Sequence, residues 1–442
     1  MTAEVLIGNG TGKRLSAHPL RAAVLGEVHA RPFTPMQAPR RVLHFAFDTA
    51  GERAQADRAA VADFCARRGL PPLKPADKQH RVALGGTVLR WEQHSEFTTY
   101  TWELPSEPDE TTPPFHPPAS SLAAPMAGVP QPGPLLVALD LHLLADRKGQ
   151  LAPERLFDRA SLAVAENSDG LALFTTDFQP DPAGFVRILV VDRGLGAERA
   201  GALVQRVVEL ETYRTLALLG LPEAQRLSPS ITRIEKRLAE VTEEMRRTEK
   251  LTDNHRLLDE LTALAAELEA GAAASLYRFG ASRAYNEIVQ LRLQTIGERK
   301  VGGLPTWSSF LARRMAPAMR TCITTEERQA NLSRKLAGAA NLLRTRVDVE
   351  MERQNRDLLK SMNERTRLQL RLQATVEGLS VAAISYYVVG LFSYLVKAAH
   401  DTGRLPFEPS YATAVFVPVA VLAIWWVVRR IRRRNISEPE PS

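Results

Sequence analysis

The stretch "HPLRAAVLGEVHARPF", residues 18–33, gathers the residue types best suited to chemistry near the start of the chain. His18, Glu27 and His29 carry side chains of the kinds that bind metal ions. Arg21 and Arg31 carry the guanidinium that recognises carboxylates and phosphates, and they would equally suit an acidic partner. Three uses stay open for this stretch: docking of a helix end onto the fold, a ligand or metal site, and catalysis.

The local pattern limits which of these side chains can meet. Pro19 suits the first turn of a short helix, whereas Pro32 forces the residue before it into an extended conformation. On such an extended arm Glu27 and His29 lie on the same side. A metal site needs further ligands. His18, His44 or His80 could supply these ligands only if the fold brought them close to Glu27 and His29.

No other motif in the chain points to catalysis or to a cofactor. The sequence contains no nucleophile elbow, phosphate-binding loop, HExxH pair or dinucleotide fingerprint. "GNGTGK" at residues 8–13 lacks the spacing of a phosphate loop, and we expect residues 1–14 to be disordered. We therefore predict no catalytic residue, no enzyme activity and no cofactor.

Composition narrows the class of protein. The net charge of +7 is spread over 442 residues, and nucleic-acid binders gather their charge on one face, so we predict no nucleic-acid partner. Cys65 and Cys322 lie far apart without a CxxC motif, which favours a reducing compartment over a disulfide framework. The first residues lack the apolar core of a signal peptide, so we expect the N-terminal part to stay in the cytoplasm.

Two apolar stretches near the C-terminus predict transmembrane helices in a lipid bilayer. Residues 378–396 and 411–428 contain no charged residue. A helix of about 20 residues crosses a hydrocarbon core of about 30 Å. The alternative is a pair of buried core helices. Tyr387 and Tyr394 share a face of the first stretch, where they would contact a neighbouring helix or line a pore.

Charge around these stretches predicts their orientation. Basic residues precede the first stretch and fill the tail at 429–442, and lysine and arginine excess marks the cytoplasmic side. Both termini are then cytoplasmic, and residues 397–410 form an outer loop. Asp401 and Glu408 lie in that loop, where carboxylates at a pore mouth concentrate cations.

Residues 205–377 predict long antiparallel helices and a coiled coil. Apolar residues follow an 11-residue repeat at Leu336, Val347 and Leu358, and beside them at Ala340, Met351 and Met362. This repeat gives about 3.67 residues per turn and a nearly straight stripe. We expect this helix to continue into the first apolar stretch and its stripe to face another part of the chain or another copy.

A second helical block has coiled-coil spacing. Its seam residues are Ile231, Ile234, Leu238, Val241 and Met245. Ser228 or Ser230 would cap its start beside Pro229.

Residues 15–204 predict an α+β or α/β cytoplasmic domain. Several runs have the alternation or β-branched content of strands, and one helical run ends at Gly69. The Pro-rich segment 105–134 is expected to be a loop outside the core.

Four long stretches carry a resemblance to a known family. They are "HPLRAAVLGEVHARPF", "YRTLALLGLPEAQRLSP", "LYRFGASRAYNEIVQLR" and "QLRLQATVEGLSVAAISYYVVGLFSYL". These stretches resemble DUF3422, a family of bacterial membrane-anchored proteins of unknown function. The resemblance implies the bacterial inner membrane and no particular activity.

The order of parts is also distantly similar to the CorA-type magnesium channels. Those channels carry a Gly-Met-Asn signature after the first span, where this chain reads "GLFSYLVKAAH". No residue can therefore be assigned to their ion-binding motif.

Two functions follow as hypotheses. The first is a membrane-anchored cytoplasmic scaffold or sensor that self-associates through its helices. The alternative is a CorA-like homo-oligomeric cation channel with a divalent cation as its partner. Two spans cannot enclose a pore, so the number of copies distinguishes the two functions.

Overall fold

The structure, a computed structural model, describes residues 4–6, 14–21, 24–25, 33–74, 77–106, 113–122, 129, 131–146, 152–248, 250–401 and 408–435. The chain divides into two compact units. The first holds Met1–Glu244 and Asp259–Ala339, and the second holds Met245–Leu258 and Ala340–Ser442.

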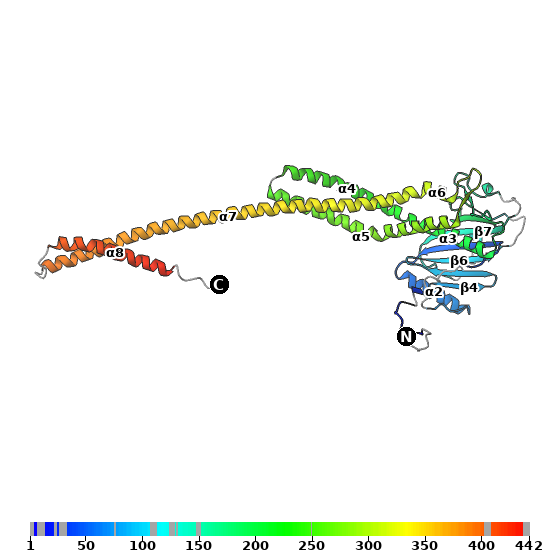
Figure 1. Cartoon of the computed structure of the whole chain (residues 1–442), viewed down its shortest axis with the longest axis horizontal. Helices are drawn as coiled ribbons and strands as arrows, with labels where there is room; N and C mark the ends of the chain where they lie inside the picture. The colour runs from blue at the N-terminus through cyan, green and yellow to red at the C-terminus, as the bar shows by residue number, and fades with distance from the viewer. Residues whose placement is uncertain are drawn as a thin grey trace. The chain divides into compact units, whose positions relative to one another are not determined.

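A mixed sheet of nine strands forms the centre of the first unit (Figure 1). Its order is β11-β8-β9-β10-β7-β3-β6-β5-β4, and β10 pairs with β7 in parallel. The strands are β3 (Arg40–Asp48), β4 (Gln79–Leu84), β5 (Thr87–Gln93), β6 (Phe97–Pro105), β7 (Leu135–Ala145), β8 (Ala163–Glu166), β9 (Ala172–Thr176), β10 (Val186–Asp192) and β11 (Arg299–Lys300). The predicted α+β class is confirmed.

Helices lie between and after the strands of this sheet. They are α2 (Arg53–Arg67), α3 (Ala197–Leu218), α4 (Gly220–Arg247), α5 (Leu251–Ile296), α6 (Trp307–Arg314), α7 (Ala316–Asp401) and α8 (Pro409–Asn435), with the short η1 (Ala119–Ser121) and η2 (Pro153–Arg155). Residue 204, where the sequence suggested a domain boundary, lies inside helix α3. Gly69, with φ of +63°, follows α2 as predicted.

Side-chain alternation along the strands gives the sheet two apolar faces. Leu139 and Leu141 of β7 pack on one face with Val207 of α3. On the other face, Leu43 and Tyr100 pack with Phe64 of α2. The sheet is therefore a central layer with α3 and α2 on opposite faces (Figure 1).

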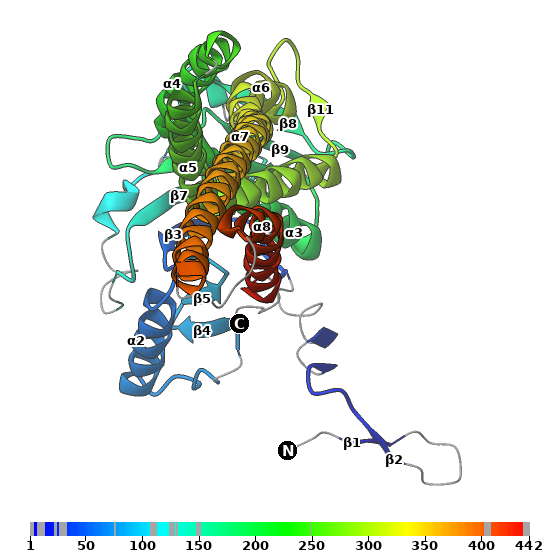
Figure 2. The same ribbon diagram turned by 90° about the vertical axis from the view of Figure 1, so that its left-hand side faces the viewer.

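The start of the chain differs from the expected disorder. Within residues 1–14, β1 (Glu4–Leu6) pairs antiparallel with β2 (Arg14–Ser16). They form a two-stranded sheet separate from the nine-stranded one, and Figure 2 labels both strands.

The Pro-rich segment 105–134 does not lie wholly outside the core. Phe115, Ala119 and Val129 are buried. Phe115 packs its ring against His142 and Phe157, with ring centroids 4.8 and 5.8 Å apart. The expectation of a loop outside the core is wrong for these residues, because scattered apolar side chains can anchor a segment that has no periodic pattern.

The seam predicted in the second helical block is buried at every one of its residues, from Ile231 to Met245. The predicted cap is wrong, however. Helix α4 begins at Gly220, and Pro229 lies inside it, so neither Ser228 nor Ser230 starts the helix. Proline is usual in the first helical turn. Inside a helix it removes its own N–H donor and its ring crowds the carbonyl four residues earlier, and in α4 the rest of the helix outweighs that cost.

Gly201 lies where α3 contacts the segment before the sheet, at Thr34 and Met36. A Cβ atom at this position would lie 1.9 Å from the carbonyl oxygen of Thr34. The Met36 N–H donates to the carbonyl of Ala197 at 2.8 Å, which holds the segment in place. We expect Gly201→Ala to destabilise the protein by about 1–3 kcal/mol, seen as a lower thermal midpoint by tryptophan fluorescence.

Gly280→Ala is the matched control. Gly280 also lies inside a helix, α5, but a Cβ atom there meets nothing within 4 Å. Because alanine favours a helix, this change should stabilise by about 0.4–1 kcal/mol. Equal gains at both sites would show that the Thr34 segment does not pack against α3.

In the second unit, α7 and α8 contain the predicted spans. Both helices are long and apolar enough to cross a membrane. Only 11% and 6% of their most apolar windows is buried, so the alternative of two buried core helices is wrong for the structure as described. The helix that enters the first apolar stretch is continuous, as predicted, because α7 runs unbroken from Ala316 to Asp401.

Candidate functional site

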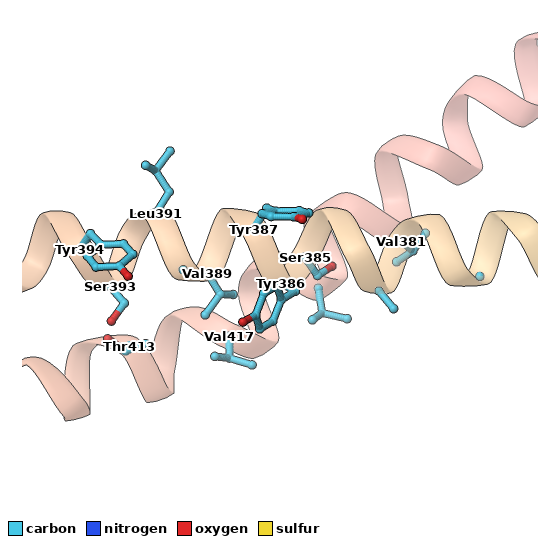
Figure 3. Close-up of a pocket in the computed structure, with 14 residues that line it drawn as sticks. Val381, Ser385, Tyr386, Tyr387, Val389, Leu391, Ser393, Tyr394, Thr413 and Val417 are labelled. Carbon is cyan, nitrogen blue, oxygen red and sulfur yellow. The ribbon is translucent and has the colours of Figure 1, made fainter.

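An open groove of about 1080 Å³ lies between α7 and α8 (Figure 3). Small and apolar residues form most of it, and hydroxyl groups are set among them. The lining residues are Gly378, Val381, Ala382, Ser385, Tyr386, Tyr387, Val389, Gly390, Leu391, Ser393, Tyr394, Thr413, Val417 and Val421. None of them carries a charged side chain at neutral pH.

The two helices meet through specific contacts beside the groove. Phe392 of α7 stacks on Phe416 of α8, with ring centroids 3.8 Å apart and an interplanar angle of 18°. Figure 3 shows Ser393 pointing toward Thr413 of the other helix. Thr413 Oγ1 donates to the carbonyl of Pro409 at 2.9 Å. Both helices therefore contribute hydroxyl groups to one groove.

Ser385 gives the groove an unused hydrogen-bonding group. This residue is buried, and its Oγ has no hydrogen-bond partner among the described residues. A hydroxyl in apolar surroundings gains free energy when a partner reaches it. Gly378 and Gly390 line the groove without a side chain. The space beside each of them is empty, since a Cβ atom at either position would meet nothing within 4 Å. The groove thus suits a helix or an acyl chain that brings a polar group.

Two of the predicted pore or outer-loop residues lie in this groove. Tyr387 and Tyr394 are both in the lining, on one helix face as predicted. Asp401 is the last residue of α7, and Glu408 directly precedes α8. Neither acidic residue is in the groove lining. The structure therefore brings the tyrosines together and does not bring the carboxylates to them.

The N-terminal candidates are only partly described. His18 is exposed, and its Nδ1 accepts a hydrogen bond from the Leu20 N–H at 3.2 Å. The Arg21 N–H donates to the His18 carbonyl at 2.9 Å, as at a helix start. Glu27, His29 and Arg31 lie outside the described residues. The metal, ligand and docking assignments of these residues stay predictions.

The histidines that were considered as further ligands are held locally. His44 is hydrogen-bonded through Nδ1 to Thr101 Oγ1 at 2.8 Å, and through Nε2 to Thr212 Oγ1 at 3.0 Å. His80 Nε2 lies 2.8 Å from the carbonyl of Pro71. Within the described part of the chain, no group of three or more metal-ligating side chains comes together.

A comparison with known protein families shows which family the chain belongs to. Residues 16–435 match the profile of DUF3422, whose members are described as proteins of unknown function. The chain belongs to the DUF3422 family. No curated protein and no solved structure matches it. The likeness of this DUF3422 protein to CorA-type channels therefore stays a prediction.

Sequence reasoning missed Ser385 and Thr413 as groove residues. A partial signal was present on α7, since Gly378 and Ala382 are small residues four apart and Ser385 follows three residues later on the same side of the helix. Small residues four apart are typical of close helix packing in membranes. Thr413 carried no such signal, because its position depends on how α8 pairs with α7.

Proposed function

We propose that this DUF3422 protein is a membrane-anchored cytoplasmic scaffold or sensor that self-associates through its helices. The bilayer and a second copy of the chain are its partners. One observation carries the proposal: the apolar stripe of α7 is buried in its first part and exposed where the same stripe continues toward the apolar span.

The change along the stripe occurs over a short distance. Leu343 and Val347 are buried, and the neighbouring Arg346 donates from Nη1 to the carbonyl of Met245 at 2.6 Å. Farther along α7, toward its C-terminal end, Met351, Leu358 and Met362 are 48%, 61% and 56% exposed. Exposed apolar side chains in a row mark a surface for association.

A second copy is the partner that fits this surface. Copies anchored in one bilayer by the same span have the same orientation, and their stripes lie at the same height above the membrane. A two-fold pair then buries identical surfaces against each other. The groove between α7 and α8 offers a further contact, where Gly390 allows a helix to approach closely.

The proposed location is the bacterial inner membrane, with both termini in the cytoplasm. Arg429 and Arg430 follow the second span, and their guanidinium groups lie 4.7 and 5.0 Å from the ring centroids of Trp425 and Trp426. Tryptophan beside arginine is the pattern of a cytoplasmic membrane interface.

Cysteine cross-linking tests the proposed contact. Leu358→Cys is introduced into the otherwise native chain, and membranes are oxidised and run on non-reducing gels. We expect a cross-linked dimer, because residue 358 of one copy would face residue 358 of the other. The native Cys65 and Cys322 are buried and provide little background.

Lys360→Cys is the matched control for this experiment. The two positions are about 200° apart around a helix at about 100° per residue, so Lys360 lies on the opposite face. We expect it to cross-link far less. Equal cross-linking at 358 and 360 would indicate random collision and contradict the proposed contact.

A further inference from the structure

The groove between α7 and α8 is apolar, but arginines follow it on α7, just beyond one end. The lining residue nearest the N-terminus of α7 is Gly378. Arg371 is seven positions before Gly378, and Arg367 is four before Arg371, so both lie on the helix face that lines the groove. Both arginines are exposed, and neither guanidinium makes an ion pair with the described residues. The groove therefore ends beside positive charge that these residues do not neutralise.

The same excess of positive charge occurs on both helices. Residues 363–377 of α7 contain three arginines and two glutamates, and residues 429–435 of α8 contain five arginines and no acidic residue. Farther from the groove the arginines have partners: Arg356 lies 3.0 Å from Glu352. Clusters of basic residues beside a transmembrane helix favour anionic headgroups.

The arginines of α8 begin at the level of the groove's end. Phe392 of α7 stacks on Phe416 of α8, with ring centroids 3.8 Å apart, and α8 turns back along α7 (Figure 1). Gly378 precedes Phe392 by 14 residues. Arg430 follows Phe416 by the same number, which is about 21 Å of helix in each case. The Arg430 guanidinium lies 5.0 Å from the ring centroid of Trp426, a contact that leaves its charge in place.

These levels match the layers of a bilayer. The uncharged stretch 378–396 gives about 28 Å of helix, close to a hydrocarbon core of about 30 Å. The edge of the core then falls near Gly378 and Arg430, and Arg371 lies about 10 Å beyond it. A headgroup layer about 5–7 Å deep fits between these levels. One leaflet provides about 15 Å of the core, so its acyl chains cover the residues from Gly378 to Tyr387.

This half of the groove suits an acyl chain. Gly378, Val381 and Ala382 line it on α7, and Val421 lines it on α8. A Cβ atom at Gly378 would meet nothing within 4 Å, so a chain can lie against the backbone there. Gly390, where we propose that a second copy approaches, lies in the other half. The two occupants therefore do not compete for the same space.

We propose that this half of the groove binds one anionic phospholipid, with an acyl chain between α7 and α8 and its phosphate at Arg371 and Arg430. Arginine suits this ligand, because its fork of N–H donors matches phosphate oxygens. A zwitterionic phospholipid offers the same chains, but it also carries a cation that the arginines repel. The proposal rests on the membrane anchoring in the proposed function and not on self-association.

Titration of the full chain in detergent with dioctanoyl phosphatidylglycerol tests the proposal. Native mass spectrometry counts the bound lipid, and the thermal midpoint reports its effect on stability. We expect one lipid per chain and a raised midpoint. Dioctanoyl phosphatidylcholine, with the same chains and no net charge, should bind at least about tenfold more weakly. Glycerol 3-phosphate, which has no chains, should not bind.

Two variants with the same change of charge locate the phosphate. Arg371→Gln should weaken phosphatidylglycerol binding about fivefold, the effect of one basic residue near the headgroup, and should barely change phosphatidylcholine binding. Arg365→Gln is the matched control. Arg365 is exposed in the same segment, but it lies about 120° around the helix from Arg371 and farther from the groove. We expect this variant to bind both lipids as the native chain does.

Gly378→Leu tests the place of the acyl chain. Leucine would fill the end of the groove, so binding of both lipids should weaken. Gly338→Leu is the matched control, since Gly338 also lies in α7, also has nothing within 4 Å of its Cβ position and is outside the lining. Both changes replace glycine by a better helix former, so both variants should fold, which the lipid-free midpoint checks.

Equal binding of the two lipids would overturn the proposal, and so would equal losses in Arg371→Gln and Arg365→Gln. A Gly378→Leu variant that loses its dimer but keeps its lipid would overturn it too, because a second copy would then fill this half of the groove. Light scattering on the same samples separates the proposals. A monomer that binds phosphatidylglycerol contradicts only self-association, whereas release of the chain from membranes by alkaline carbonate contradicts the anchoring itself.

Discussion

Asp140→Ala is expected to lower the free energy of unfolding by about 3–5 kcal/mol, because it leaves a buried arginine without its partner. Arg41 Nε and Nη2 donate to the two carboxylate oxygens of Asp140 at 2.9 and 2.6 Å. The Asp140 side chain is 1% exposed. The third contact of Arg41, to the carbonyl of Pro117 at 2.7 Å, cannot neutralise its charge. The thermal midpoint of the detergent-purified chain measures the loss.

Asp63→Ala is the matched control, since it removes a carboxylate from an exposed pair. Asp63 lies 2.9 Å from Arg67, and both side chains are 63% exposed. Exposed pairs contribute about 0–1 kcal/mol, so the midpoint should barely move. Replacing both partners, Arg41→Met with Asp140→Leu, should recover much of the stability, because no unpaired charge remains. Similar midpoints for Asp140→Ala and Asp63→Ala would show that Arg41 reaches solvent.

Acid should unfold the first unit through His44 and His142. Burial lowers the pKa of each histidine from 6.5 to about 3, with nearby Arg90 adding to the effect at His44 and Arg41 at His142. The unfolded chain therefore binds more protons than the folded chain between pH 6.5 and about 3. Stability is full above pH 6.5 and falls with pH, by up to about 1.4 kcal/mol per pH unit for each histidine.

Buried carboxyls act in the opposite sense. Burial raises the pKa of Asp57 and of Asp140 above 3.8, so their protonation favours the folded state as the pH falls. Between pH 6.5 and 5 the net slope is therefore the histidine effect, reduced by that of any buried carboxyl that titrates there. Thermal midpoints across this range measure the slope.

His142→Leu is the informative variant for this prediction. The Nε2 of His142 makes no hydrogen bond to the described residues and lies 3.6 Å from Asp140 Oδ1, so leucine removes this weak contact and the ring contact with Phe115 but no hydrogen bond. We expect the histidine contribution to the slope between pH 6.5 and 5 to fall by about half, since one of the two buried histidines is removed. An unchanged slope would show that His142 is not the group that takes up the proton.

Local patterns predicted the elements of the fold better than their starts and contacts. The strands from β3 to β10 follow runs of alternating or β-branched residues, and α2 ends beside Gly69. The start of α4 was missed because Pro229 is a common helix-start signal that long-range packing overrode. The sequence also held no sign that β10 pairs with β7 in parallel, since strand order depends on the whole sheet.

The features that could not be predicted depend on contacts between residues far apart in the sequence. Arg41 and Asp140 are 99 positions apart, and both lie in strands with no feature that links them. A cavity of about 570 Å³ in the first unit likewise brings together residues of α2, the β5–β6 turn, α3 and α5. The tyrosine face of α7 was predictable, because Tyr387 and Tyr394 recur within one helix, where spacing alone sets the face.

The number of copies in a detergent micelle or nanodisc tests the central claim most directly. Light scattering of the full chain, corrected for detergent and lipid, gives that number. We predict two copies, paired through the exposed stripe at Met351, Leu358 and Met362. A monomer at all accessible concentrations would contradict self-association, and a ring of about five copies would instead support a CorA-like cation channel.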